Sequence, residues 1–196
     1  MGVLLVPIAV LKAVNDVLLR IGRAVAIVAL AIMVAVVLAQ VFFRYALNNA
    51  LPWPDEAARF MMLWLTGLIA PMAYRRGGFV AIDMLEQAIP RRLGALLSLT
   101  LLGIALAVLV IAVQIGWNEV TGFGGRFATA SLYVPTSLGF DSWYRVPRSW
   151  MMASLLVGLG LLILVNLELM LRQIVTLMGE EDKLPKLPVV ELPEAE

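Results

Sequence analysis

The amino-acid sequence predicts an all-α membrane protein with four transmembrane helices. Four long apolar stretches divide the chain, and they predict membrane spans at about residues 24–45, 56–75, 93–118 and 148–171. Each stretch is long enough to cross a hydrocarbon core of about 30 Å as a helix. The composition agrees, because 62% of the residues are hydrophobic and the mean hydropathy is +0.93, well above the usage of soluble domains. We therefore expect one membrane domain over residues 24–172.

Residues 1–23 precede the first span and are predicted to form an N-terminal amphipathic helix. Apolar side chains recur on one helical face from Ile8 to Ile21, and the other face carries Lys12, Asn15, Asp16, Arg20 and Arg23. This pattern is typical of a helix that lies at the membrane interface or docks on a partner. A simple lead-in to the first span is the alternative.

A second short interfacial helix is expected on the cytoplasmic side, between spans 2 and 3. Gly77 and Gly78 end span 2, and an apolar stripe then runs from Phe79 to Ile89, with Asp83 elsewhere around the helix. The tail of residues 173–196 is acidic and Pro-rich, so we expect it to be disordered.

Lysine and arginine residues are divided unequally between the two sides of the membrane. Ten of them lie in the N-terminal arm, the connection between spans 2 and 3, and the tail, whereas five lie on the opposite side. Cytoplasmic segments carry the excess of these residues in membrane proteins. Both termini are therefore predicted to be cytoplasmic, with the other two connections on the outer side.

The chain contains no Cys and no His. This excludes thiolate nucleophiles, imidazole bases, haem ligation by His and the usual zinc sites. No phosphate-binding glycine motif is present, and a net charge of +1 gives no reason to expect nucleic acid as a partner. We expect no enzymatic activity, no catalytic residue, no metal and no cofactor.

The densest group of polar residues surrounds the predicted outer ends of spans 1 and 2. Asp55 and Glu56 begin span 2, where acidic side chains stabilise a helix N-terminus, and Arg59 follows at a spacing that allows it to pair with either. Two Arg and two carboxylates sum to zero, so no carboxylate is left over to bind a cation. We interpret this group as a structural charge network and docking surface rather than an ion relay, and it comprises Arg44, Trp53, Asp55, Glu56, Arg59 and Trp64.

Four polar residues of spans 3 and 4 offer a rival interpretation, in which the chain alone forms a homo-oligomeric channel or small exporter with a path lined by Gln114, Asn118, Glu119 and Asn166. Such groups more often mark a helix end or a polar contact between helices. Glu168 and Arg172, four residues apart, are predicted to pair at the interface with their charged ends reaching to water. Gly158 and Gly160 predict close helix packing.

The segment from Val41 to Leu85 resembles the signature of the small membrane subunit of tripartite ATP-independent periplasmic (TRAP) transporters, the DctQ-like family. The resemblance lies in Phe43-Arg44-Tyr45 at the end of span 1, Trp53 in the following turn, the Asp55-Glu56-x-x-Arg59 start of span 2, Trp64 and Asp83. The sequence departs from the family at Asp55, where Glu is common, and at Phe79-Val80, which replaces a His-Ile pair. No role of that His is carried over.

The resemblance implies a scaffold role beside a large TRAP membrane subunit that carries the substrate and sodium sites. A periplasmic substrate-binding protein would deliver a carboxylate or similar organic anion and dock transiently on the outer face, and an ion gradient would supply the energy. The protein would lie in the bacterial inner membrane, in contact with membrane lipids. Arg44, Asp55, Glu56 and Arg59 would hold the outer ends of spans 1 and 2, and Asp83 would stabilise the cytoplasmic interfacial segment.

The connection between spans 3 and 4, residues 120–148, is the longest in the chain. It is either a contact for the substrate-delivering protein or a tolerated insertion.

Overall fold

The computed structural model describes residues 2–76, 91–136 and 141–179. Its helices are α1 (Gly2–Tyr45), α2 (Pro54–Arg75), α4 (Arg91–Thr121) and α5 (Arg148–Leu177), joined by a 3-10 turn η1 (Gly124–Arg126) and by strands β1 (Ala128–Pro135) and β2 (Trp143–Pro147). All four α-helices are long and apolar enough to cross a membrane. The predicted all-α membrane class with four spans is confirmed.

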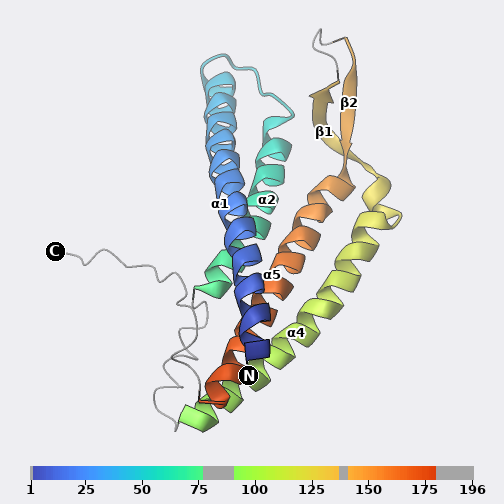
Figure 1. Ribbon diagram of the computed structural model, residues 1–196. Coiled ribbons are helices and arrows are strands. Elements are labelled where there is room, and N and C mark those ends of the chain that lie inside the picture. Colours follow the sequence, from blue (N-terminus) through green and yellow to red (C-terminus); the bar gives the residue numbers. More distant parts are fainter. Residues whose placement is uncertain (1, 77–90, 137–140, 180–196) are drawn as a thin grey trace, which may run out of the picture.

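The helices form an elongated bundle in which α1 lies beside α2 and α4 lies beside α5 (Figure 1). Helix α5 is central, since it contacts α1, α2 and α4. The two strands project from one end of the bundle, which we call the hairpin end, and the chain begins near the other, which we call the N-terminal end (Figure 1).

Helix α1 is continuous over 44 residues, so the predicted boundary between an arm ending at residue 23 and a span beginning at residue 24 is not a break in the helix. Its buried positions recur three, four or seven residues apart, as Ile8, Asn15, Leu19, Gly22, Ala26 and Ala29. This is the spacing of a helix–helix seam. Small residues allow a close approach: a Cβ added at Gly22 would lie 3.6 Å from the carbonyl oxygen of Leu68 in α2.

Helices α2 and α5 cross most closely at two glycines. A Cβ added at Gly158 would lie 2.7 Å from the carbonyl oxygen of Gly67, and a Cβ added at Gly67 would collide with the carbonyl oxygen of Ser154. Pro71 has no N–H, so it leaves the Gly67 oxygen without its usual intrahelical donor. The close packing predicted at Gly158 is confirmed, whereas nothing lies within 4 Å of a Cβ added at Gly160.

The long connection before α5 contains an antiparallel hairpin, for which the sequence predicted no strands. Tyr133 pairs with Arg145, and Pro135 pairs with Trp143. Thr129 turns inward and donates to the carbonyl oxygen of Val146 at 2.7 Å, which secures the base of the hairpin.

Helices α4 and α5 continue past the predicted ends of spans 3 and 4. Helix α4 ends at Thr121 and α5 at Leu177, so the first residues of the predicted tail are helical. The predicted interfacial helix after span 2, including Asp83, and the tail beyond residue 179 lie outside the described residues.

Candidate functional site

A buried polar cluster joins α1, α2 and α5 near the N-terminal end, and Glu168 is its centre. The Glu168 side chain is 0% exposed. Its Oε1 accepts hydrogen bonds from Arg75 Nη2 at 2.9 Å and from Arg172 Nε and Nη2 at 3.2 and 3.0 Å. Its Oε2 accepts from Asn15 Nδ2 at 2.7 Å. One carboxylate therefore binds side chains from three helices.

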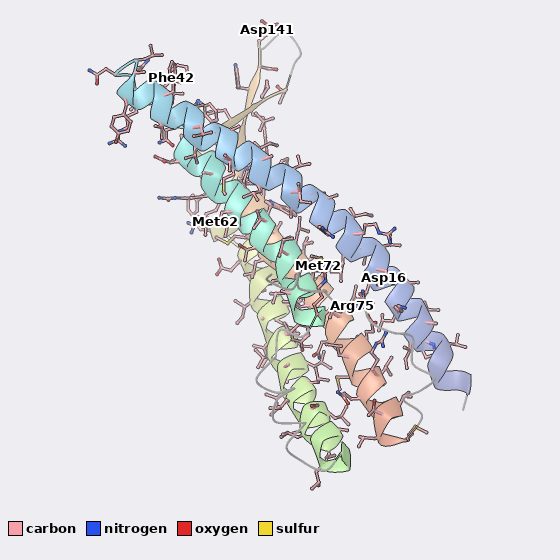
Figure 2. All side chains as sticks on the ribbon, turned by 90° about the vertical axis from the view of Figure 1, so that its left-hand side faces the viewer. Asp16, Phe42, Met62, Met72, Arg75 and Asp141 are labelled. Carbon is pink, nitrogen blue, oxygen red and sulfur yellow. The ribbon has the colours of Figure 1, made fainter. Side chains whose placement is uncertain are left out.

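The charges of the cluster's described residues sum to zero. Arg75 also donates from Nη1 to Asp16 Oδ1 at 2.5 Å, and the two residues lie side by side on α2 and α1 (Figure 2). Asp16 and Glu168 balance Arg75 and Arg172, and buried charges are tolerated only when they are paired in this way. Asp16 is the member with the largest contact with solvent, its side chain being 36% exposed. The described members of the cluster carry no surplus charge that would attract an ion.

The structure corrects the prediction for Glu168 and Arg172. Their pairing is present, with Arg172 Nη2 and Glu168 Oε1 3.0 Å apart, but the charged ends do not reach to water, because both residues are buried. Asn15 and Arg75, supplied by other helices, surround the carboxylate instead. The sequence placed Asn15 on the polar face of the amphipathic helix, but the structure buries it on the same face as Ile8 and Gly22. The seven-residue spacing of these three residues was the available signal.

Asn166 forms a second buried link from α5. Its Oδ1 accepts a hydrogen bond from the hydroxyl of Tyr74 in α2, and its Nδ2 donates to the carbonyl oxygen of Leu102 in α4 at 3.1 Å. The residues of the hypothetical path do not come together: Asn166 is fully buried, whereas the other three lie on the exposed surface of α4, as Gln114, Asn118 and Glu119.

At the hairpin end, Glu56 ties the first turn of α2 to β1. Its carboxylate accepts hydrogen bonds from the backbone N–H groups of Ala130 and Ser131 at 2.8 and 2.5 Å, and lies 2.8 Å from the Ser131 hydroxyl. The same hydroxyl lies 2.9 Å from the carbonyl oxygen of Pro52. Glu56 thus supplies acceptors to backbone N–H groups in the part of β1 where pairing with β2 is irregular.

Asp55 links α1 to α2, because it accepts a hydrogen bond from Gln40 Nε2 at 2.9 Å. The expected pairing of Arg59 does not occur: among the described residues, neither Arg59 nor Arg44 forms an ion pair with Asp55 or Glu56. The physical reason is that both carboxylates have other partners, one of which is the hairpin that the sequence analysis missed.

The remaining members of the predicted network form no charge network among the described residues. Arg59 is exposed, and the Arg44 guanidinium lies 5.8 Å from the centre of the Tyr45 ring. Trp53 directly precedes α2 and is partly exposed. The ring of Trp64 lies 6.4 Å from that of Phe60. No three metal-binding side chains converge within the part of the chain that the structure describes.

Comparison with known proteins agrees with this architecture. The family model described as "Tripartite ATP-independent periplasmic transporters, DctQ component" matches residues 33–176, which is more than half of the chain. The chain belongs to the DctQ family. Among its relatives is the "C4-dicarboxylate TRAP transporter small permease protein DctQ" of Vibrio cholerae serotype O1, which is 26% identical over 141 residues. The resemblance seen in the sequence is confirmed.

Two limits of the match are informative. The alignment covers 66% of this DctQ-family chain and 61% of the Vibrio cholerae protein, so the chain spans less than two thirds of that curated relative. The family model begins at residue 33, so it contains Arg75, Glu168 and the hairpin but not Asn15 or Asp16. Membership of the DctQ family and the four apolar helices indicate a component of a transporter in the bacterial inner membrane.

Proposed function

We propose that this DctQ-family chain is the small scaffold subunit of a TRAP transporter that imports carboxylates or similar organic anions with the energy of an ion gradient. One observation carries the proposal: among the described residues, the charged groups of the buried cluster neutralise one another. Glu168, Asp16, Arg75 and Arg172 hold helices together, which leaves none of them free to capture a solute. A rigid, neutral bundle with a lipid-compatible surface is suited to enlarge the fixed part of a larger membrane assembly.

The partners follow from the same proposal. A large membrane subunit carries the solute and ion sites, and a periplasmic substrate-binding protein docks transiently on the outer face. The excess of Lys and Arg at the N-terminal end supports a cytoplasmic location for both termini. The hairpin end then faces the periplasm. Exposed aromatic side chains on the described part of the hairpin suit a protein contact, namely Tyr133, Trp143 and Tyr144. Glu56 fixes the strand that carries Tyr133.

The test is reconstitution in liposomes. Succinate is a four-carbon dicarboxylate, the class that the name of the Vibrio cholerae relative gives, and its uptake should require the chain, the large subunit that co-purifies with it, the binding protein and an inward sodium gradient together. Removing the chain or collapsing the gradient with an ionophore should abolish uptake. Flux through liposomes that contain this chain alone would overturn the proposal in favour of a homo-oligomeric channel.

A further inference from the structure

At the N-terminal end of the bundle, four cations of the described residues lie outside the buried cluster. They are Lys12, Arg20 and Arg23 of α1 and Arg76, which directly follows α2. No ion pair joins any of them to an acidic side chain within the part of the chain that the structure describes. Asp16 and Glu168 are engaged with Arg75 and Arg172 instead. This end of the protein therefore presents unpaired positive charge.

One side of α1 changes from charged to apolar along its length. Its charged part comprises Lys12, Asp16, Arg20 and Arg23, and its apolar part comprises Ile27, Leu30 and Val34. Spacings of three and four residues throughout place all of them on one side of the helix. The apolar part is open, with exposed fractions of 57, 45 and 48%. This side of α1 thus has the same division into a charged part and an apolar part as a phospholipid.

The change from charged to apolar marks the edge of the hydrocarbon core. Exposed charged side chains are excluded from the core, and Arg20 and Arg23 are both exposed. The next charge along α1 is Arg44, after the uncharged residues 24–43. Those residues make about 30 Å of helix, which matches a core of about 30 Å. Arg20 and Arg23 therefore lie at the level where the phosphates of one leaflet are found.

The two guanidinium groups at this level are suited to hold a phosphate. Arg20 and Arg23 are three residues apart, so their side chains are neighbours on the helix surface. A guanidinium donates two parallel hydrogen bonds to a phosphate. Arg76 adds a further cation nearby, because it follows Arg75, which binds Asp16 one helical turn from Arg20 (Figure 2).

Depth and charge together favour a lipid over an acidic protein segment as the ligand. A protein carboxylate brought to the edge of the hydrocarbon core would lose hydration, whereas a phospholipid phosphate already occupies that level. The acyl chains of the same molecule would cover the apolar part of this side of α1. A zwitterionic headgroup also carries a cation, which the unpaired cations of this end would repel.

We propose that Arg20 and Arg23 form a binding site for the phosphate of an anionic phospholipid. Its acyl chains pack on the apolar part of the same side of α1, and Arg76 increases the positive charge around the headgroup. In the orientation proposed above, the lipid belongs to the cytoplasmic leaflet. Both arginines precede residues 33–176, the part that the family model matches. The site goes beyond the scaffold role, which requires no particular lipid.

The first experiment measures the phospholipid that the full-length chain retains. Anionic phosphatidylglycerol and zwitterionic phosphatidylethanolamine are titrated in equal amounts into the chain in detergent, and bound lipids are counted by native mass spectrometry. We expect the wild-type chain to prefer phosphatidylglycerol. Arg20→Gln combined with Arg23→Gln should weaken this binding roughly 30-fold, since each Arg near a membrane surface contributes about a factor of five.

A double variant at the hairpin end is the matched control. Arg44→Gln combined with Arg59→Gln also removes two exposed guanidinium groups, and it should retain phosphatidylglycerol as the wild-type chain does. Inorganic phosphate at the same concentration should not displace the lipid. Displacement would reveal a site for a free anion and would overturn the proposal, as would equal retention by the two double variants.

The second experiment locates the lipid without any substitution. Phosphatidylglycerol with a photoreactive acyl chain is irradiated with the wild-type chain in nanodiscs, and trypsin then releases residues 24–44, which include the apolar part of the site. We expect this peptide to be labelled several times more than by phosphatidylcholine with the same acyl chain. About 1 M salt, which screens charges beyond about 3 Å, should remove the difference.

The remaining outcomes identify other occupants. Equal labelling by the two lipids at low salt would overturn the lipid site. If phosphatidylglycerol binds only after removal of residues 180–196, the acidic tail occupies the site instead. If the complex with the co-purified large subunit loses the lipid, that protein covers the site. Either result overturns the proposal, and neither affects the scaffold role, which the uptake assay tests.

Discussion

The buried carboxylate of Glu168 is the group whose loss should destabilise this bundle most. In Glu168→Gln the side chain keeps its shape but loses its charge, so Asp16 is the acid that remains among the described residues of the cluster. An amide nitrogen also replaces an accepting oxygen. Whichever way the amide turns, its N–H groups face either the Asn15 amide or the guanidinium groups, all of which donate hydrogen bonds.

The expected loss of stability follows from the charge that is left unpaired. Removing one partner of a buried ion pair costs about 3–5 kcal/mol. The lower end applies here, because the amide retains one accepting oxygen and Asp16 still neutralises one guanidinium. For a chain of this size about 1 kcal/mol lowers the midpoint of thermal unfolding by about 2–4 °C. We therefore expect the midpoint to fall by roughly 6–12 °C.

The assay is thermal unfolding of the purified chain in detergent, followed by tryptophan fluorescence. Glu119→Gln is the matched control, because it makes the same chemical change at an exposed position and should alter stability by no more than about 0.5 kcal/mol. Adding Arg172→Gln to Glu168→Gln removes a cation that Glu168 neutralises in the wild-type chain and should recover part of the lost stability, as expected for coupled residues. A midpoint for Glu168→Gln equal to that of Glu119→Gln would refute the claim that this cluster binds the helices together.

Three other substitutions test the remaining contacts. Gly158→Ala should lower the unfolding midpoint by several degrees, because its Cβ would lie 2.7 Å from a backbone oxygen of α2, whereas Gly160→Ala should not; equal midpoints would contradict the close crossing. Glu56→Gln should speed hydrogen exchange of the backbone amides of Ala130 and Ser131, which donate hydrogen bonds to its carboxylate, and unchanged exchange would show that the carboxylate does not protect them. Arg59→Ala should leave the unfolding midpoint unchanged. A clear fall in the midpoint would instead support the ion pair of Arg59 that the sequence predicted.

The polar centre of the bundle was less predictable than its spans because its members are distant in the chain. Asn15 and Glu168 are separated by 153 positions, and each taken alone resembles a residue at a membrane boundary. Arg75 was counted with the charges of a cytoplasmic connection, yet it is buried. Only the packing of α1 and α2 against α5 turns these residues toward one another.

The partners of Glu56 were hidden for a different reason. Its carboxylate oxygens accept hydrogen bonds from backbone N–H groups of β1. Almost every residue has such a group, so the sequence does not show which ones will bind. The spacing of Arg59 after Glu56 therefore predicted a side-chain pair that the hairpin displaces. A short alternating strand within a Gly-containing connection is a weak signal beside four strongly apolar helices.

The sequence by itself determined the membrane class, the four spans and the family resemblance, because insertion into lipid depends on how apolar each local stretch of chain is. The tertiary structure decided which charges neutralise one another, where the hairpin is anchored and which face of α1 is left open. Those features depend on which helices are neighbours, and a helix carries polar residues toward a neighbour only once the neighbour's position is set.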